Sequence, residues 1–250
     1  MKRFWLCVLA TALVLTVVGC AGQQATRRTP RPSGVSPSAQ ASLPPTPSAA
    51  DLGRPITNPW YPLQQGMKWV YQGVKDGEVT TDTMTVTSKT KQIMGVPATV
   101  VSDELTSHGR VVESTEDWFT QDAQGNVWYL GEATTSFNPD GSVESTEGSW
   151  QAGVNGARAG IFMPATPTVG AAYFQEYYKG QAEDRFRILS MHASVTVPYG
   201  SFSDAMRTYE QTRLEPNVAT EKFYIRGIGM VAENDVKGPT EFNKLVTFHK

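Results

Sequence analysis

The stretch from Glu116 to Glu132, EDWFTQDAQGNVWYLGE, constrains the fold of this chain more than any other. Two aromatic-rich runs, Asp117–Gln121 and Asn126–Leu130, flank the four residues Asp122–Gly125. Glycine late in such a turn adopts a positive φ at little cost, and short β-type runs on either side are typical of a β-hairpin. The stretch therefore predicts two antiparallel strands joined by a tight turn.

The register of this hairpin decides which face of the sheet each aromatic side chain occupies. Counting back from the turn places Phe119 opposite Trp128 and Trp118 opposite Tyr129, and directly opposed residues share a face. A shift of one residue would exchange these partners but leave aromatics on both faces. Aromatics on both faces predict a central pair of strands that is covered on both sides.

The rest of the chain, from about residue 55 to residue 250, continues in short runs of strand type separated by Gly, Pro, Asn and Asp turns. Any helix is expected to be short, near Ser203–Arg207. The pattern predicts one mostly antiparallel β domain over residues 55–250. Besides the central hairpin, the predicted strands are Lys68–Val74, Val79–Ser88, Ala98–Leu105, Arg110–Thr115, Thr134–Phe137, Ser142–Glu147, Tyr173–Tyr178, Asp184–His192, Ser194–Val197, Phe223–Arg226, Met230–Asp235 and Lys244–His249.

The segment Gly148–Gly170 interrupts this pattern with several glycines and two prolines, and it also carries Trp150, Phe162 and Met163. A long irregular segment with apolar residues of its own is often a cover over a binding site. It can equally be a packing loop that caps one end of a barrel. Both interpretations stay open at this point.

Residues 1–19 are typical of a bacterial lipoprotein signal peptide. The basic start Lys2-Arg3 precedes the apolar run Phe4–Val18, which is too short for a good transmembrane helix. The sequence Val17-Val18-Gly19-Cys20 resembles a lipobox, in which the cysteine becomes the new N-terminus and carries the lipid. We therefore expect Cys20 to anchor the protein to the extracytoplasmic side of the cell membrane or outer membrane.

Residues 20–54 comprise this cysteine and a segment rich in Pro, Ser and Ala with almost no large apolar side chains. Such a segment cannot bury enough surface to offset the entropy lost on ordering, so we expect a disordered tether.

The two cysteines of the chain, Cys7 and Cys20, both precede the domain. The domain therefore has no thiol for a disulfide, a thiolate metal site or a nucleophile. The net charge of −2 becomes more negative once the signal peptide is removed, and this argues against a nucleic-acid partner.

No motif for catalysis is complete. Residues Gly227–Ala232 match the dinucleotide fingerprint in letters, but the next residues continue as a strand and not as the required helix. Ser88–Lys91 matches S-x-x-K without its companion motifs. The three histidines, His108, His192 and His249, have no metal-ligand spacing. We expect no enzyme activity, no cofactor and no metal; the alternative from another class is a hydrolase whose site the fold assembles from scattered residues.

Three signatures carry a family resemblance: Pro62–Tyr71 (PLQQGMKWVY), Val195–Arg207 (VTVPYGSFSDAMR) and Phe223–Val231 (FYIRGIGMV). Their order resembles uncharacterised secreted bacterial β-rich proteins akin to the lipoprotein-carrier superfamily typified by LolA and LppX. The resemblance implies a mainly β fold, a strongly curved antiparallel sheet or incomplete β-barrel with few short helices. Carriers of this kind usually cover the sheet with helices, and this sequence shows few.

The resemblance also implies a function, since the better-known carriers hold lipid or acyl chains in the concavity of the sheet. We expect an apolar ligand or a lipid beneath Gly148–Gly170. The alternative binding function is a protein-interaction module of the cell envelope with a filled core, whose partner the sequence does not identify. The candidate ligand-binding residues are Trp118, Tyr129, Trp150, Phe162, Met163 and Tyr177.

Overall fold

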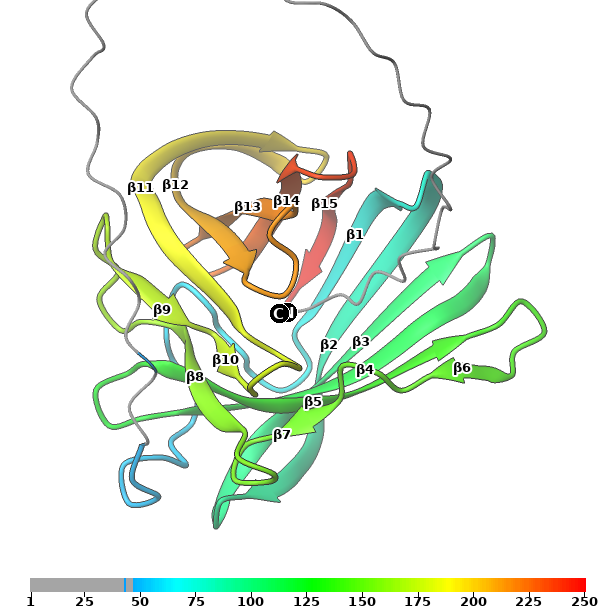
Figure 1. Cartoon of the computed structure of the whole chain (residues 1–250). Coiled ribbons are helices and arrows are strands. Elements are labelled where there is room, and N and C mark those ends of the chain that lie inside the picture. The colour runs from blue at the N-terminus through cyan, green and yellow to red at the C-terminus, as the bar shows by residue number, and fades with distance from the viewer. Residues whose placement is uncertain (1–42, 44–46) are drawn as a thin grey trace, which may run out of the picture.

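The computed structural model describes residue 43 and residues 47–250, and their strands form one antiparallel sheet that curls into a nearly closed barrel (Figure 1). The sheet contains fifteen strands, and no helix is present among the described residues. The predicted fold class, a curved antiparallel sheet or incomplete barrel, is confirmed. The strands are β1 Lys68–Lys75, β2 Glu78–Ile93, β3 Val96–Ser107, β4 Arg110–Gln121, β5 Val127–Phe137, β6 Val143–Ser145, β7 Trp150–Gln151, β8 Arg158–Met163, β9 Ala172–Phe174, β10 Glu176–Tyr177, β11 Asp184–Val197, β12 Gly200–Thr212, β13 Ala219–Ile225, β14 Gly229–Lys237 and β15 Phe242–His249.

The strand order around the wall is β10-β8-β5-β4-β3-β2-β1-β15-β14-β13-β12-β11-β9, with β6 and β7 pairing to β5 off this path. Most neighbours are consecutive hairpins, which explains why local turn signals locate so many strands. The pairing of strands farthest apart in the sequence is that of β1 with β15, where Trp69 lies opposite Phe248 and Val74 opposite Phe242. This pairing joins the strands that come first and last in the sequence.

The two ends of the sheet meet between β8 and the connection of β9 to β10. The backbone N–H of Gln175 donates to the Asp184 carbonyl at 2.8 Å, which ties this connection to β11. Gly160 of β8 lies directly beneath it, because a Cβ on Gly160 would stand 2.2 Å from the Gln175 carbonyl oxygen. Only a glycine permits this approach, so the barrel closes at a point where no side chain separates the two ends.

The segment before β1 packs across one end of the barrel. The backbone N–H groups of Thr57 and Asn58 both donate to Gln121 Oε1 at 2.9 Å. The Asn58 side-chain amide donates to the carbonyls of Gly125 and Pro164 at 2.9 and 3.1 Å. This segment therefore holds the β4–β5 turn and the end of β8 together, and we call this end the closed end. The opposite end, where β1, β3 and β14 finish, is called the mouth.

The central hairpin is present, but its predicted pairing is wrong by one residue. Phe119 lies opposite Tyr129, and a bulge between Trp118 and Phe119 shifts the register further along the strand. Trp118 and Trp128 consequently share one face, while Phe119 and Tyr129 share the other. Aromatics do occupy both faces, as the sequence predicts.

The Asp122 carboxylate explains this register. Its Oδ1 accepts from the backbone N–H of Gln124 at 3.0 Å and of Asn126 at 2.8 Å. Its Oδ2 accepts from Asn126 Nδ2 and from Trp128 Nε1, each at 2.8 Å. These four bonds hold Asn126 in the turn. The second strand therefore begins at Val127, one residue later than predicted.

Two further expectations about local structure are wrong. Gly148–Gly170 is neither a lid nor a simple packing loop, because it contains β7 and β8, and β8 is a strand of the barrel wall. Ser203–Arg207 lies inside β12, since the neighbouring strands β11 and β13 pair with it on both sides. Tertiary pairing overrides the local preference in both places.

Candidate functional site

The mouth of the barrel contains a cavity of about 80 Å³. Its wall comes from the ends of β1, β3, β12 and β14, from the starts of β2, β11, β13 and β15, and from the β12–β13 loop. In Figure 1 the C-terminal strands of this wall, β13 to β15, are orange to red and stand beside the cyan β1. The charged or amide side chains that line the cavity are Lys75, Asp184, Glu210, Gln211, Glu215, Lys222, Glu233, Asp235, Glu241 and Asn243.

A buried ion pair lies on one side of this cavity. Lys222 is 2% exposed, and its Nζ lies 2.7 Å from Glu210 Oε2 and 3.7 Å from Glu233 Oε1. The sheet register brings these groups together, because Lys222 on β13 lies opposite Glu233 on β14. Glu210 is further positioned by Thr208, whose hydroxyl lies 3.3 Å from Oε1. The carboxylates of Glu210 and Glu233 thus compensate the positive charge of the Lys222 ammonium.

The other side of the cavity presents acceptor atoms without donors. The buried oxygens Asp235 Oδ2, Glu241 Oε2 and Asn243 Oδ1 have no hydrogen-bond partner. Glu241 and Asn243 are only 6% and 7% exposed, so bulk water does not readily solvate them. Buried polar atoms in folded proteins are nearly always paired, so three orphan acceptors around one cavity are unusual.

The same carboxylates are anchored through their second oxygens. Asp235 Oδ1 accepts from the Thr220 hydroxyl at 3.2 Å, and Glu241 Oε1 accepts from the backbone N–H of Asp76 at 2.9 Å. Each side chain is therefore held in place by one oxygen while the other oxygen stays unpartnered. This arrangement resembles a preorganised acceptor set more than two mobile surface acids.

Gly73 makes room for the third acceptor. A Cβ on Gly73 would stand 2.2 Å from Asn243 Oδ1 and 2.1 Å from the Phe242 carbonyl oxygen. Gly73 lies opposite Asn243 in the β1–β15 pairing. The missing side chain of Gly73 therefore allows the Asn243 amide to lie over β1.

Burial raises the pKa of both acids at this wall. The pKa of Asp235 rises to about 6, chiefly through burial, and the hydrogen bond from Thr220 offsets part of the rise. The pKa of Glu241 rises to about 7, again chiefly through burial, with the Asp76 backbone bond acting in the opposite direction. Both carboxyls therefore change charge between mildly acidic and neutral pH.

The polar side chains of this wall are carboxyls, amides, lysines and threonines. No serine, histidine or cysteine is among the residues that line the cavity. In the part of the chain that the structure describes, no group of three or more His, Cys, Asp or Glu side chains could hold a metal ion.

A second polar cluster lies within the barrel wall between β4, β5 and β10. The Tyr129 hydroxyl donates to Asp117 Oδ1 at 2.5 Å, and Glu132 is 3% exposed. Burial raises the pKa of Glu132 well above its usual value, and the nearby carboxylates of Glu176 and Asp117 raise it further. Thr134 donates to Glu132 Oε2 at 3.3 Å. Burial therefore favours the protonated form of Glu132.

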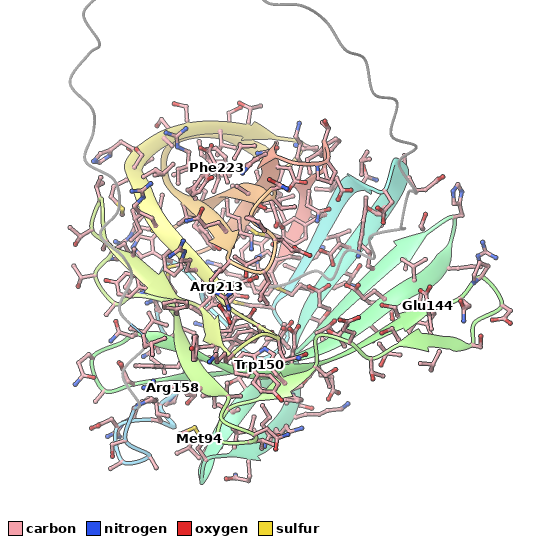
Figure 2. All side chains as sticks on the ribbon, in the orientation of Figure 1. Met94, Glu144, Trp150, Arg158, Arg213 and Phe223 are labelled. Carbon is pink, nitrogen blue, oxygen red and sulfur yellow. The ribbon has the colours of Figure 1, made fainter. Side chains whose placement is uncertain are left out.

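Of the six predicted ligand-binding residues, the structure brings three into one cluster. Tyr129 contacts Trp150 and Phe162 edge-on, with ring centroids 5.4 and 5.8 Å apart. Figure 2 labels Trp150 next to β5 and β7. Phe119 and Tyr61 complete the group, and the ring centroids of Tyr61 and Phe162 are 4.5 Å apart. These rings are buried against one another and form part of the core.

The remaining predicted residues lie elsewhere. Trp118 points to the opposite face, where Lys91 Nζ lies 3.6 Å above its ring. Tyr177 is half-buried against Phe174, with ring centroids 5.6 Å apart. Met163 is buried in the core. None of the six lines the cavity at the mouth, and Cys20 lies outside the described residues.

The cavity at the mouth is not among the sites predicted from the sequence. One signal was available: Glu233 and Asp235 alternate along a predicted strand, so both face the same side of the sheet. Acidic residues two positions apart in a strand with buried neighbours indicate a polar patch inside the barrel. Their partners Lys222 and Thr220 on β13 could not be placed from such a local pattern.

Comparisons with known proteins give two solved structures with a related shape. One is a Bacteroides fragilis protein assigned as exported, with a YmcC-like fold; its TM-score is 0.45 at 14% identity, over 76% of this chain and 99% of that chain. The other is a Parabacteroides distasonis protein assigned as a lipoprotein; its TM-score is 0.41 at 12% identity, over 76% of this chain and 98% of that chain. No family model matches the chain, and no curated protein matches it either. The resemblance to the LolA and LppX superfamily therefore stays a prediction.

Among the described residues, no helix has the length and hydropathy that are needed to cross a bilayer.

Proposed function

We propose that this protein is a non-enzymatic lipoprotein of the extracytoplasmic surface whose barrel binds a small polar ligand at its mouth. One observation carries the proposal: three buried acceptor atoms, Asp235 Oδ2, Glu241 Oε2 and Asn243 Oδ1, surround a cavity and have no donor. A buried acceptor left unpaired costs about 1–3 kcal/mol. A ligand with matching donors would offset that cost on all three atoms.

The binding proposal is tested with the purified full-length protein in detergent. Small polar compounds that carry hydrogen-bond donors are titrated, and binding is followed by calorimetry and by the shift in thermal unfolding. We expect at least one class of compound to bind, and Asn243→Ala and Glu241→Gln to weaken that binding. The matched control is Glu144→Gln, an exposed acid on β6 that does not line the cavity (Figure 2). If Asn243→Ala and Glu241→Gln leave the affinity unchanged, the ligand binds elsewhere on the protein.

The location rests on the lipobox at Cys20, which the described residues do not include. The expected result is that Cys20→Ala moves the protein from the membrane fraction to a soluble or signal-retaining form. A Cys20→Ala protein that stays in the membrane after its signal peptide has been removed would contradict the anchor. The anchor and the polar ligand are independent proposals, because the residues that carry the ligand proposal all lie between Val74 and Asn243, far along the chain from Cys20.

The lipid-carrier function predicted from the sequence depends on a cluster that is packed with its own side chains. An acyl chain could enter beside Tyr129 and Phe162 only if their mutual contacts opened, so the geometry favours the filled-core alternative. Native mass spectrometry of the full-length protein, followed by organic extraction, decides between them. A co-purifying lipid that is lost in Phe162→Ala would support the carrier function, and its absence would support the filled core.

A hydrolase is the candidate from another class, and one observation favours it. Glu241 keeps its proton up to about pH 7, as a general acid requires. The proposed binding function predicts no turnover of chromogenic glycosides or esters. Hydrolysis that disappears in Glu241→Gln would replace the binding proposal.

A further inference from the structure

We infer that the cavity at the barrel mouth binds the primary ammonium group of a short alkylamine. This inference rests on the proposed polar-ligand function and names the chemical class of its ligand.

The first step is the match of donors to acceptors. Asp235 Oδ2, Glu241 Oε2 and Asn243 Oδ1 are all acceptors as placed, and none has a partner. A primary ammonium carries three N–H donors and no acceptor, so one such group can supply every missing bond. A hydroxyl supplies one donor, and a quaternary ammonium supplies none.

The second step is charge. The lysines at the cavity are already engaged: Lys222 pairs with Glu210 and Glu233, and Lys75 lies 3.2 Å from Glu113 Oε2. Asp235 and Glu241 form no ion pair with a lysine or arginine of the described residues. When both are ionised, no lysine or arginine of the described residues lies within ion-pair distance of either acid, and a cationic ligand is the complement that they lack.

The third step is shape. A volume of about 80 Å³ admits an ammonium and a few methylene groups but not a large ring system. The cavity is also lined by apolar side chains, including Val74, Leu105 and Phe242, which suit an alkyl chain. Because the cavity opens at the mouth, the rest of a longer amine can extend into solvent.

We expect binding of the ammonium to release protons from the cavity. The ammonium competes with the protons that Asp235 and Glu241 hold at mildly acidic pH. The charged groups that face this wall from the surrounding strands are Lys75 on β1, Asp184 on β11, Glu210 on β12, Lys222 on β13 and Glu233 on β14, with Asp76 and Glu215 in the adjacent turns. The lysines favour the ionised forms of Asp235 and Glu241, and the neighbouring carboxylates disfavour them. Titration of binding against pH measures the net effect of these charges on the ionisation of the two acids.

The experiment uses the full-length protein in detergent and 1,4-diaminobutane as the probe. Calorimetric titrations at pH 5.5 and pH 8 are compared with titrations of tetramethylammonium, which has charge but no N–H donor, and of 1,4-butanediol, which has hydroxyls but no charge. We expect the diamine to bind, with an affinity roughly tenfold or more higher at pH 8 than at pH 5.5, because two acids of pKa about 6 and 7 lose their protons in this interval. Neither comparison compound should bind comparably.

Variants separate the inference from a loss of folding. Glu241→Gln should weaken diamine binding about tenfold or more at pH 8, while Glu144→Gln should leave it unchanged. Asn243→Asp keeps the shape of the side chain and adds a negative charge, so it should tighten diamine binding; a misfolded protein cannot give this result.

The outcomes also separate this inference from the proposed function. If 1,4-butanediol binds as well as the diamine and Glu241→Gln weakens both, the polar-ligand function stands and the ammonium inference is overturned. If no compound binds, and Asn243→Asp produces no response, both are overturned, and the orphan oxygens are satisfied by protons that the two acids share.

Discussion

The ammonium of Lys222 lies 2.7 Å from Glu210 Oε2 inside the barrel, where the lysine is 2% exposed. Glu233 approaches the same ammonium from the next strand at 3.7 Å. A lysine so deeply buried depends on these carboxylates, because an uncompensated charge in a protein interior is costly. The three charges therefore act as a unit in the stability of strands β12 to β14.

The first prediction is that Lys222→Met lowers the free energy of unfolding by about 3–5 kcal/mol, since it leaves the buried Glu210 and the partly buried Glu233 without their cation. The double variant Lys222→Met/Glu210→Gln should recover part of this loss. Urea denaturation measures both. Lys89→Met is the control, because its ammonium pairs with Glu116 at the surface and such pairs contribute about 1 kcal/mol or less. Equal losses in the two lysine variants would contradict the buried unit.

The second prediction concerns the turn of the central hairpin. Asp122→Ala removes the acceptor of four hydrogen bonds, so the free energy of unfolding should fall by about 2–4 kcal/mol. Asp140→Ala is a matched control, since Asp140 accepts from the backbone and hydroxyl of Ser142 in the exposed β5–β6 turn. The loss at Asp140 should be much smaller. Similar midpoints of chemical denaturation for the two variants would disprove the role of Asp122.

The third prediction is a dependence of stability on pH. Because the folded-state pKa of Glu132 is raised above its usual 4.5, its contribution to stability is complete below about pH 4.5 and is lost as the pH rises through the folded value. Glu132→Gln stays neutral, so the variant should gain stability relative to the natural protein as the pH rises. Urea midpoints from pH 4.5 to pH 9 measure the difference, with Glu144→Gln as control. Parallel curves would contradict the prediction; Asp235 and Glu241 affect both proteins equally.

The fourth prediction concerns the closure of the barrel. A methyl group on Gly160 would stand 2.2 Å from the Gln175 carbonyl oxygen, so Gly160→Ala should lower the free energy of unfolding by at least about 2 kcal/mol. Gly200→Ala is the control, since its added Cβ would meet only the Phe202 ring at 3.5 Å. Differential scanning calorimetry should show a lower Tm for the first variant alone. An unchanged Tm in Gly160→Ala would mean that the two ends of the sheet can separate without cost.

The sequence predicts the strands well where the evidence for them is local. The Asn138–Gly141 turn and the alternation of Val79–Ser88 each lie within a few residues, and both predicted elements are present. The predicted register of the central hairpin was wrong because one side chain, Asp122, decides where the turn ends. A side-chain hydrogen bond of this kind leaves no trace in the hydrophobic pattern.

The remaining failures have a tertiary origin. Gly153 and Gly156 suggested an irregular segment, yet they form the tight connection between β7 and β8, both at positive φ. The mouth was missed because Asn243 on β15 lies against Gly73 on β1, and the sequence does not reveal that β1 and β15 pair. The predicted aromatic residues are important for packing, and this is the more common role of buried rings.

The pairing of β1 with β15 also sets an order of events during folding. The hairpins from β2 to β5 can form as soon as their residues are available, but β1 finds its second neighbour only when Phe242–His249 can reach it. Bringing such distant segments together carries a large loop-closure entropy and slows folding. A chain interrupted before Phe242 would leave β1 and β14 as two open edges, so the wall would unroll into a curved sheet in place of a barrel missing one strand. The ring of strands therefore cannot close before Phe242–His249 is in place beside β1.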